Sequence, residues 1–167
     1  FMTDRYLDDE DATSKAFRDG WFYPGDLGII DKYDVLDIIG RTDEVINVGG
    51  EKYLLNDIDE VLSNNECTRY ACAFKKPIST ETSEIVACIV LAGPIDRETA
   101  VLRVHQTAIQ KLPPKVVPKT FLVVDELDVN PDSVPIRRKA QAQFIAVVSR
   151  ADPIELSQRL FHIREGE

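Results

Sequence analysis

The spacing of apolar and polar residues predicts a series of short strands. Apolar runs of four to eight residues, bounded by Gly, Pro, Asp or Asn, are typical of strands in a small sheet. Pro24-Gly25 marks a turn before the first pair, and the polar residues 31–34 separate its members as in a β-hairpin. The strands expected from this pattern are residues 27–30, 35–39, 45–48, 52–55, 70–74, 84–91 and 120–124.

Four stretches follow the helical period instead. A short acidic helix is expected before a stop at Asp19-Gly20, and a second over residues 57–63 with Asn56 as its N-cap. Asp96 and Thr99 introduce a third helix that ends near residue 111, because two prolines follow. A last helix is expected from about residue 136 or 137 to 148. The predicted buried face of the third helix consists of Val101, Val104, Ala108, Ile109 and Leu112.

The order of these elements predicts an α+β fold, with a short β-hairpin and a small mixed sheet flanked by helices. The charged turn from Arg41 to Glu44 places a domain boundary near residue 43. The expected division is therefore residues 1–42, residues 43–148 and a polar tail over residues 149–167.

Composition narrows the classes of function. The 167 residues are 44% hydrophobic and 29% charged, as in ordinary globular chains, and no apolar run approaches the roughly 18 residues of a membrane span. A cytoplasmic protein without a membrane span is expected. The net charge of −9 argues against nucleic acid and anionic membrane surfaces as partners.

The three cysteines do not follow a metal-binding or disulfide pattern. The cysteines are odd in number and lack a CxxC spacing: they are Cys67, Cys72 and Cys88. The chain has only two histidines that could serve as further metal ligands. Buried, reduced thiols are therefore expected.

One stretch, GRTDEVINVGGEKY from Gly40 to Tyr53, combines a charged turn with a strand and a glycine pair. Gly49 and Gly50 can adopt positive φ, which suits a tight hairpin turn and also lets a ligand approach the backbone closely. The pattern alone leaves two interpretations open: an ordinary hairpin with a solvated entrance, or a functional loop.

Three motifs in order give the chain a resemblance. GWFYPGDLGIID is similar to "GWFxTGDLG", GRTDEVINVGGEKYLLNDIDEVL to "GRxDxxIxxGGxxIxxxEIExxL", and KLPPKVVPKTFLVVDELDVNPDS to "LxxYKxPxxxxxVxxLPxTxxGK". All three are found in the C-terminal part of adenylate-forming (AMP-binding) acyl-CoA synthetases and ligases. The resemblance covers residues 1–139, most of the chain.

The resemblance implies a two-step ligation. A carboxylate reacts with ATP to give an acyl-adenylate, and coenzyme A or another thiol then displaces AMP. It implies ATP/AMP, Mg and coenzyme A as cofactors of a full-length protein and none bound to the isolated chain, which is expected to be inactive. Residues 1–42 would be the tail of a large N-terminal adenylating domain, the implied partner, and residues 43–148 the mobile C-terminal domain that rotates between the steps.

The same resemblance assigns roles to individual residues. Asp26 falls on an aspartate that accepts hydrogen bonds from the ribose hydroxyls, and Arg41 on an arginine that contacts ribose and phosphate oxygens. Asp43 falls on the hinge. Gly49, Gly50 and Glu51 fall on the loop that lines the pantetheine tunnel. For Asp26 and Arg41 the alternative is an ordinary polar turn residue.

The chain departs from the family at its catalytic lysine. Aligning IRRKA with the family's "IxRxx" places Val134 on the glycine and Pro135 on the lysine of the usual Gly-Lys pair. Arg137 either takes over that charge in a shifted alignment or forms the basic first turn of the last helix. Two hypotheses follow: a ligase fragment whose usual lysine is replaced, or a non-catalytic, degenerate ligase domain that acts as a protein-interaction module.

Overall fold

The computed structural model describes residues 3–77, 83–150 and 160–162, and it divides into two compact units between Val45 and Ile46. The sequence predicted a boundary near residue 43 between two functional domains. That boundary remains a prediction, because compactness alone does not assign a function to either unit. Each unit is described by itself below.

The first unit consists of a short helix and two hairpins. Helix α1 (Glu10–Ala16) begins at Asp9, whose carboxylate accepts a hydrogen bond from the Ala12 amide as an N-cap. Strands β1 (Phe17–Arg18) and β2 (Trp21–Phe22) pair across the turn at Asp19 and Gly20, which both have positive φ. The helix thus ends earlier than predicted, because Phe17 stacks on Phe22 as a strand residue instead.

The second hairpin of this unit pairs β3 (Asp26–Ile30) with β4 (Leu36–Arg41) in antiparallel register. Its strands agree closely with the prediction. Most of their large apolar side chains are exposed on both faces of the described hairpin. The exposed side chains include Ile29, Ile30, Leu36, Ile38 and Ile39.

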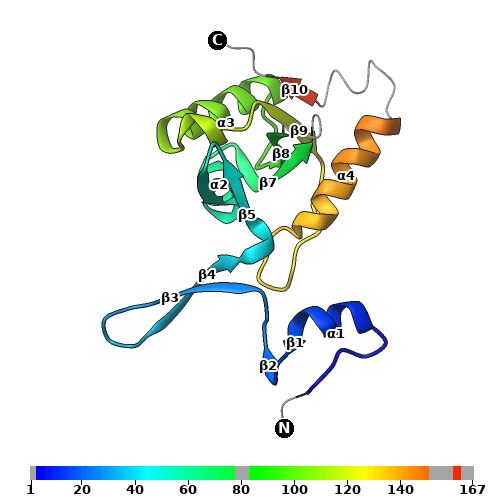
Figure 1. The fold of residues 1–167 in the computed structure, drawn as a ribbon. Helices are drawn as coiled ribbons and strands as arrows, with labels where there is room; N and C mark the ends of the chain where they lie inside the picture. Colours follow the sequence, from blue (N-terminus) through cyan, green and yellow to red (C-terminus); the bar gives the residue numbers. More distant parts are fainter. Residues whose placement is uncertain (1–2, 78–82, 151–159, 163–167) are drawn as a thin grey trace. The chain divides into compact units, whose positions relative to one another are not determined.

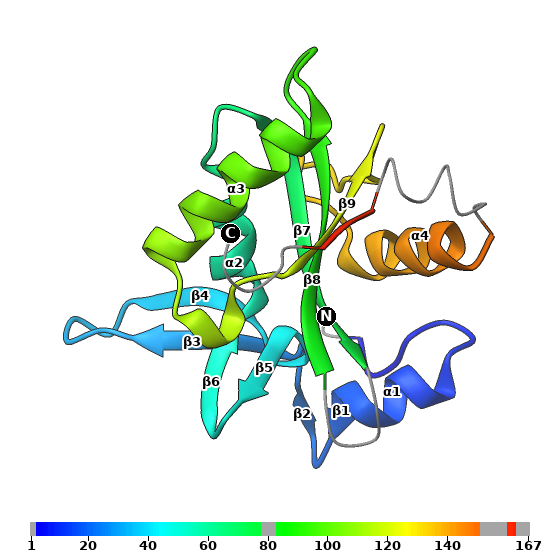
Figure 2. The same ribbon diagram turned by 90° about the horizontal axis from the view of Figure 1, so that it is seen from above.

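The second unit is built on a four-stranded mixed sheet in the order β10-β9-β8-β7 (Figures 1 and 2). Strands β7 (Thr68–Pro77) and β8 (Ser83–Leu91) are antiparallel, and β9 (Thr120–Val124) runs parallel to β8. Strand β10 (Leu160–His162) adds antiparallel to β9. The predicted polar tail thus contains a strand, which its short apolar run did not reveal. Residues 78–82, between β7 and β8, lie outside the described residues.

Helices cover both faces of this sheet. Helices α2 (Leu55–Ser63) and α3 (Arg97–Lys111) lie on one face, and α4 (Arg137–Arg150) lies on the other, as Figure 2 shows. Alternate residues of β7 point to opposite faces, so that Ala71 and Ala73 join one core while Cys72 and Phe74 join the other. The predicted α+β fold, with a hairpin and a small mixed sheet flanked by helices, is confirmed.

A short hairpin precedes the sheet. Strands β5 (Val45–Val48) and β6 (Glu51–Leu54) pair with each other, and the one-turn helix η1 (Thr42–Glu44) comes before them. A second one-turn helix, η2 (Pro114–Val116), connects α3 to β9.

One helix cap is confirmed, and two other local expectations about the helices are wrong. Asp96 caps α3 by accepting from the Thr99 amide at 2.8 Å, as predicted. Asn56 is not the N-cap of α2: the helix already includes Leu55, and Leu54 stands at the cap without a side-chain bond. Ile109 does not belong to the buried face of α3, since it is 54% exposed.

The three cysteines are free and buried, as expected of structural thiols. Burial, and the neighbouring Cys72 thiol, raise the pKa of Cys88 well above its ordinary value. Cys72 and Cys88 lie opposite each other in the β7–β8 register, on the face covered by α4. None of the described helices is long and apolar enough to cross a membrane.

Candidate functional site

In the first unit, Asp26 and Arg41 are direct partners across the β3–β4 hairpin. The Arg41 Nη1 atom lies 3.2 Å from the Asp26 Oδ1 atom and 3.2 Å from the Pro24 carbonyl oxygen. Its Nε atom donates to Asp43 at 3.1 Å. The three residues that the family resemblance singled out in this part of the chain therefore form one connected cluster.

Backbone geometry places the Arg41 side chain. Gly25 has φ +82°, and a Cβ atom at that position would lie 3.2 Å from the Arg41 Nη2 atom. The Gly25 carbonyl accepts hydrogen bonds from the Thr42 amide and hydroxyl, which ties the two ends of the hairpin together. A glycine is needed here both for its positive φ and for the space that the guanidinium occupies.

The cluster is accessible to solvent. The Arg41 and Asp26 side chains are 50% and 35% exposed, and Asp43 is 71% exposed. Asp43, and after it Asp26, raise the pKa of Arg41 above its ordinary value. Exposed ion pairs contribute little to the stability of the fold. A polar ligand could therefore take over these donors and acceptors with little loss of stability.

In the second unit, the β5–β6 turn has both glycines in the left-handed region, with φ +61° at Gly49 and +86° at Gly50. This is the geometry of a tight two-residue hairpin turn. The Asn47 side chain stabilises the turn by accepting a hydrogen bond from the Gly50 amide at 3.1 Å.

Lys115 on η2 lies against this turn, a contact that the pattern of the sequence did not predict. Its Nζ atom is 3.5 Å from the Glu51 carboxylate and would lie 3.3 Å from a Cβ atom at Gly49. Glu51 also accepts a hydrogen bond from the Tyr53 hydroxyl, and this bond, followed by Lys115, lowers the Glu51 pKa. Lys115 directly follows the two prolines that end the predicted third helix, and no local signal in the sequence pointed to the glycine turn.

The turn between Asp128 and Ile136 carries Pro135 and closes on itself. The Ile136 amide donates to the Asp128 carbonyl at 2.8 Å, and Val129 and Pro135 form an isolated antiparallel bridge. The Asn130 side chain accepts from the Val134 amide at 2.9 Å. Ser133 has φ +63°, a left-handed conformation that glycine adopts most easily.

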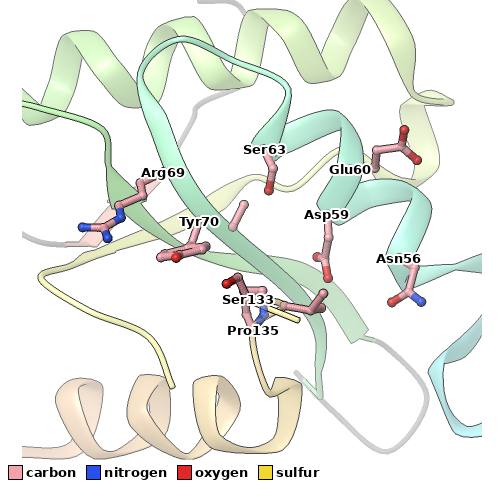
Figure 3. A pocket seen from close by; sticks show the side chains of 10 residues that line it. Asn56, Asp59, Glu60, Ser63, Arg69, Tyr70, Ser133 and Pro135 are labelled. Atoms are coloured by element: carbon pink, nitrogen blue, oxygen red, sulfur yellow. The ribbon is translucent and has the colours of Figure 1, made fainter. Parts of the chain in front are cut away.

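This turn forms one wall of a hollow of about 430 Å³ in the second unit (Figure 3). The other walls come from α2 and from the first residues of β7. The lining residues are Asn56, Asp59, Glu60, Ser63, Arg69, Tyr70, Ala71, Ser133, Val134 and Pro135.

Arg137 points away from solvent, toward α2 and β7. Its guanidinium forms an ion pair with Asp59 at 2.9 Å and donates to the side-chain oxygen of Asn56 at 2.7 Å and to the Ala73 carbonyl. Its side chain is only 13% exposed. Lys139, the next lysine along the chain, pairs with Asp128 at 3.4 Å.

Comparison with curated proteins gives several relatives that are named as CoA ligases. The chain is 33% identical over 151 residues to a probable CoA ligase, CCL9, of Humulus lupulus, covering 90% of the chain and 28% of the relative. It is 34% identical over 129 residues to a 2-succinylbenzoate–CoA ligase of Geobacillus sp., covering 77% and 26%. The chain thus spans about a quarter of the length of these relatives. No protein-family model matches the chain.

Solved structures show the same fold at lower identity. The O-succinylbenzoate coenzyme A synthetase of Bacillus subtilis in complex with AMP is 24% identical, with a TM-score of 0.63 over 81% of this chain and 27% of that one. An anthranilate CoA ligase in complex with anthranoyl-AMP is 18% identical, with a TM-score of 0.68 over 87% and 27%. Both are ligases whose matched region amounts to about a quarter of the molecule.

Proposed function

Since the chain belongs to the adenylate-forming ligase superfamily and matches the C-terminal part of its members, we propose that it forms the C-terminal portion of an acyl-CoA synthetase-like ligase. In the first step of that reaction a substrate carboxylate attacks the α-phosphate of ATP, and the bond to pyrophosphate breaks. In the second step a thiol attacks the acyl carbonyl, and AMP leaves with the electron pair of the broken bond. ATP with Mg and coenzyme A are the cofactors that go with this reaction.

The paired side chains of Asp26 and Arg41 are the observation that carries the proposal. An ionised carboxylate can accept two hydrogen bonds from a ribose diol, and a guanidinium beside it can donate to ribose or phosphate oxygens. The two side chains lie 3.2 Å apart and are partly exposed, so a nucleotide can reach both. Asp43, bonded to the same guanidinium, is the proposed hinge.

The glycine turn has a different proposed role, in the thiol step. Two adjacent residues without side chains leave space for the narrow pantetheine chain, and Glu51 borders that space. Lys115 and Tyr53 hold Glu51 in place in the described structure. This supports a preformed loop, which a thiol tunnel requires.

We propose that the site is completed by a large N-terminal adenylating domain, the partner of this chain. The β3–β4 hairpin supports this, because a two-stranded hairpin with apolar side chains exposed on both faces is marginal in water. The phosphate-binding loop and the acyl pocket would belong to that domain, so the isolated chain is expected to be inactive. A cytoplasmic location would keep its three thiols reduced.

The second part of the proposal is that an apolar residue replaces the family's catalytic lysine. The turn from Asp128 to Ile136 contains no lysine or arginine. Pro135 occupies the lysine position in the alignment given above. If the left-handed Ser133 is aligned with the family's glycine, Val134 and not Pro135 occupies the lysine position. In either register the side chain is apolar and cannot donate to a carboxylate or a phosphate.

Nucleotide binding tests the first part of the proposal. In the longest natural polypeptide that contains this chain, Asp26→Ala should weaken AMP binding about 10- to 100-fold, because hydrogen bonds to a charged group contribute about 1.5–3 kcal/mol. Asp37→Ala, an exposed carboxylate on the neighbouring strand, is the matched control. Equal effects of the two substitutions, measured by isothermal titration calorimetry, would show that Asp26 does not contact the nucleotide.

ATP–pyrophosphate exchange tests the second part. Pro135→Lys and Val134→Lys are each made in the same polypeptide, and one of them should raise the exchange rate by restoring an ammonium group. If neither changes it, the lysine is not the missing group.

The alternative function is a non-catalytic, degenerate ligase domain that serves as a protein-interaction module. The apolar residue in the lysine position favours it. A polypeptide that binds no adenine nucleotide, and gains no exchange activity from either lysine, would support this alternative.

A further inference from the structure

Strand β7 lies at an edge of the four-stranded sheet. Among the described residues it pairs with β8 on one side only. An edge strand presents backbone N–H and C=O groups without a neighbouring strand, and such groups are usually covered or blocked in native proteins. We therefore asked which groups bond the free backbone edge of β7.

At Ala73 two side chains take the place of the missing strand. The Asp59 Oδ1 atom accepts from the Ala73 amide at 2.5 Å, and Arg137 donates to the Ala73 carbonyl. The Asp59 Oδ2 atom and the Arg137 Nη1 atom form the ion pair that joins these two side chains. An acceptor and a donor are thus presented to one residue, as a neighbouring strand would present them.

This cap is largely buried and spans three elements. The Arg137 and Asp59 side chains are 13% and 17% exposed, and they come from α4 and α2. Removing one partner of such a pair leaves an uncompensated charge away from water, which is costly. The pair therefore fixes α2 and α4 to the same point of the sheet edge.

The position of Arg137 in the chain extends this effect to the neighbouring turn. Arg137 directly follows Ile136, whose amide closes the turn on the Asp128 carbonyl. Its second Nη atom bonds Asn56, a residue that faces Pro135 and Ser133 across the hollow in Figure 3. Arg137 thus connects the base of the turn to α2, which forms another wall of the hollow.

We infer that Asp59 and Arg137 form a cap on the free edge of β7, and that Arg137 is a positioning residue for the turn from Asp128 to Ile136. The importance of this turn for catalysis rests on the proposed function, whereas the cap itself does not. A lysine at position 137 would carry three N–H donors on a single nitrogen, and it could not bond Ala73, Asp59 and Asn56 with one planar group. The arginine is therefore required for its shape.

Amide hydrogen exchange, followed by NMR on the complete chain, tests the cap without any nucleotide or enzymatic activity. Asp59→Ala should accelerate exchange of the Ala73 amide at least tenfold more than that of the Ala87 amide. Ala87 lies opposite Ala73 in the interior strand β8 and serves as the internal control for general destabilisation. Equal acceleration of both amides would contradict the cap.

Two milder substitutions separate the two bonds and guard against loss of the fold. Asp59→Asn keeps an oxygen for the Ala73 amide but loses the charge that holds Arg137, so the Ile136 amide should exchange faster while Ala73 stays protected. Arg137→Met should accelerate exchange of the Ile136 amide at least tenfold, and Arg137→Lys should give an intermediate rate. An Ile136 amide that is unchanged in Arg137→Met would overturn the positioning role, whatever the outcome of the nucleotide-binding experiments.

Discussion

Replacing Phe144 by alanine should strongly destabilise the second unit, because this side chain joins α4 to the sheet. Phe144 is 2% exposed and packs edge-to-face on Phe74, with ring centroids 5.4 Å apart. Truncating a buried phenylalanine removes its transfer free energy and leaves a cavity, at a cost of about 3–5 kcal/mol. The aromatic pair contributes about 0.5–1.5 kcal/mol of that total. We expect the free energy of unfolding to fall by about 4 kcal/mol.

Urea unfolding followed by far-UV circular dichroism measures this change. Fluorescence is unsuitable, since the single tryptophan, Trp21, lies in the other unit. Ile145→Ala is the matched control: it is the next residue of the same helix, and it is 56% exposed. The control should cost less than about 1 kcal/mol, because little apolar surface leaves water at this position. If Phe144→Ala costs no more than Ile145→Ala, the packing of α4 described above is incorrect.

Three further outcomes are expected. Leu62→Ala, at a fully buried position, should lower the free energy of unfolding by about 2–5 kcal/mol in urea titrations, and Leu102→Ala, which is 39% exposed, by much less. Burial, and after it a nearby lysine, lower the pKa of His105 below its ordinary 6.5, so the unfolded chain binds the proton more readily. Stability should therefore decrease as the pH falls below about 6.5, and His105→Gln should reduce that slope in unfolding curves taken at several pH values. Gly49→Ala should cost about 1 kcal/mol, because φ is +61° there, whereas Gly93→Ala in ordinary backbone and open space should be nearly neutral in thermal melts.

The sequence predicted the sheet well because its strands are short apolar runs between strong turn signals. Residues 45–48 and 120–124 were predicted with the bounds that the structure has. The strand β10 was missed, since three residues give too little periodicity to stand out in a polar segment. Its pairing partner β9 lies about forty residues away, and such long-range pairing leaves no local trace.

Helix ends were harder to predict than helices. Asn56 has the side chain of an N-cap, and local preference alone assigns it that role. In the structure its side-chain oxygen is instead used by Arg137, 81 residues further along the chain. Tertiary contacts of this kind override a local preference that contributes only about 1 kcal/mol.

The candidate site was predictable where its residues are neighbours in a hairpin. Asp26 and Arg41 come from the two strands of one hairpin, so the pattern of the sequence already brings them close. The contact of Lys115 with the glycine turn joins segments more than sixty residues apart. No spacing rule connects a loop after one helix with a turn before another, and the contact could only be seen in the folded chain.

The sequence left two roles open for Arg137, and its contacts favour the basic first turn of the last helix over a replacement for the lysine. To act on a substrate, its guanidinium would have to leave the Ala73 carbonyl, Asn56 and Asp59 together. That movement would separate a largely buried carboxylate from the positive charge beside it and would take a hydrogen-bond donor from a buried carbonyl, at a cost of several kcal/mol. A catalytic group cannot carry such a penalty in every turnover without losing most of its advantage, because each 1.4 kcal/mol is a tenfold loss in rate. Arg137 is therefore better suited to hold the turn than to replace the lysine, and the Lys substitutions at positions 134 and 135 are the variants that address catalysis.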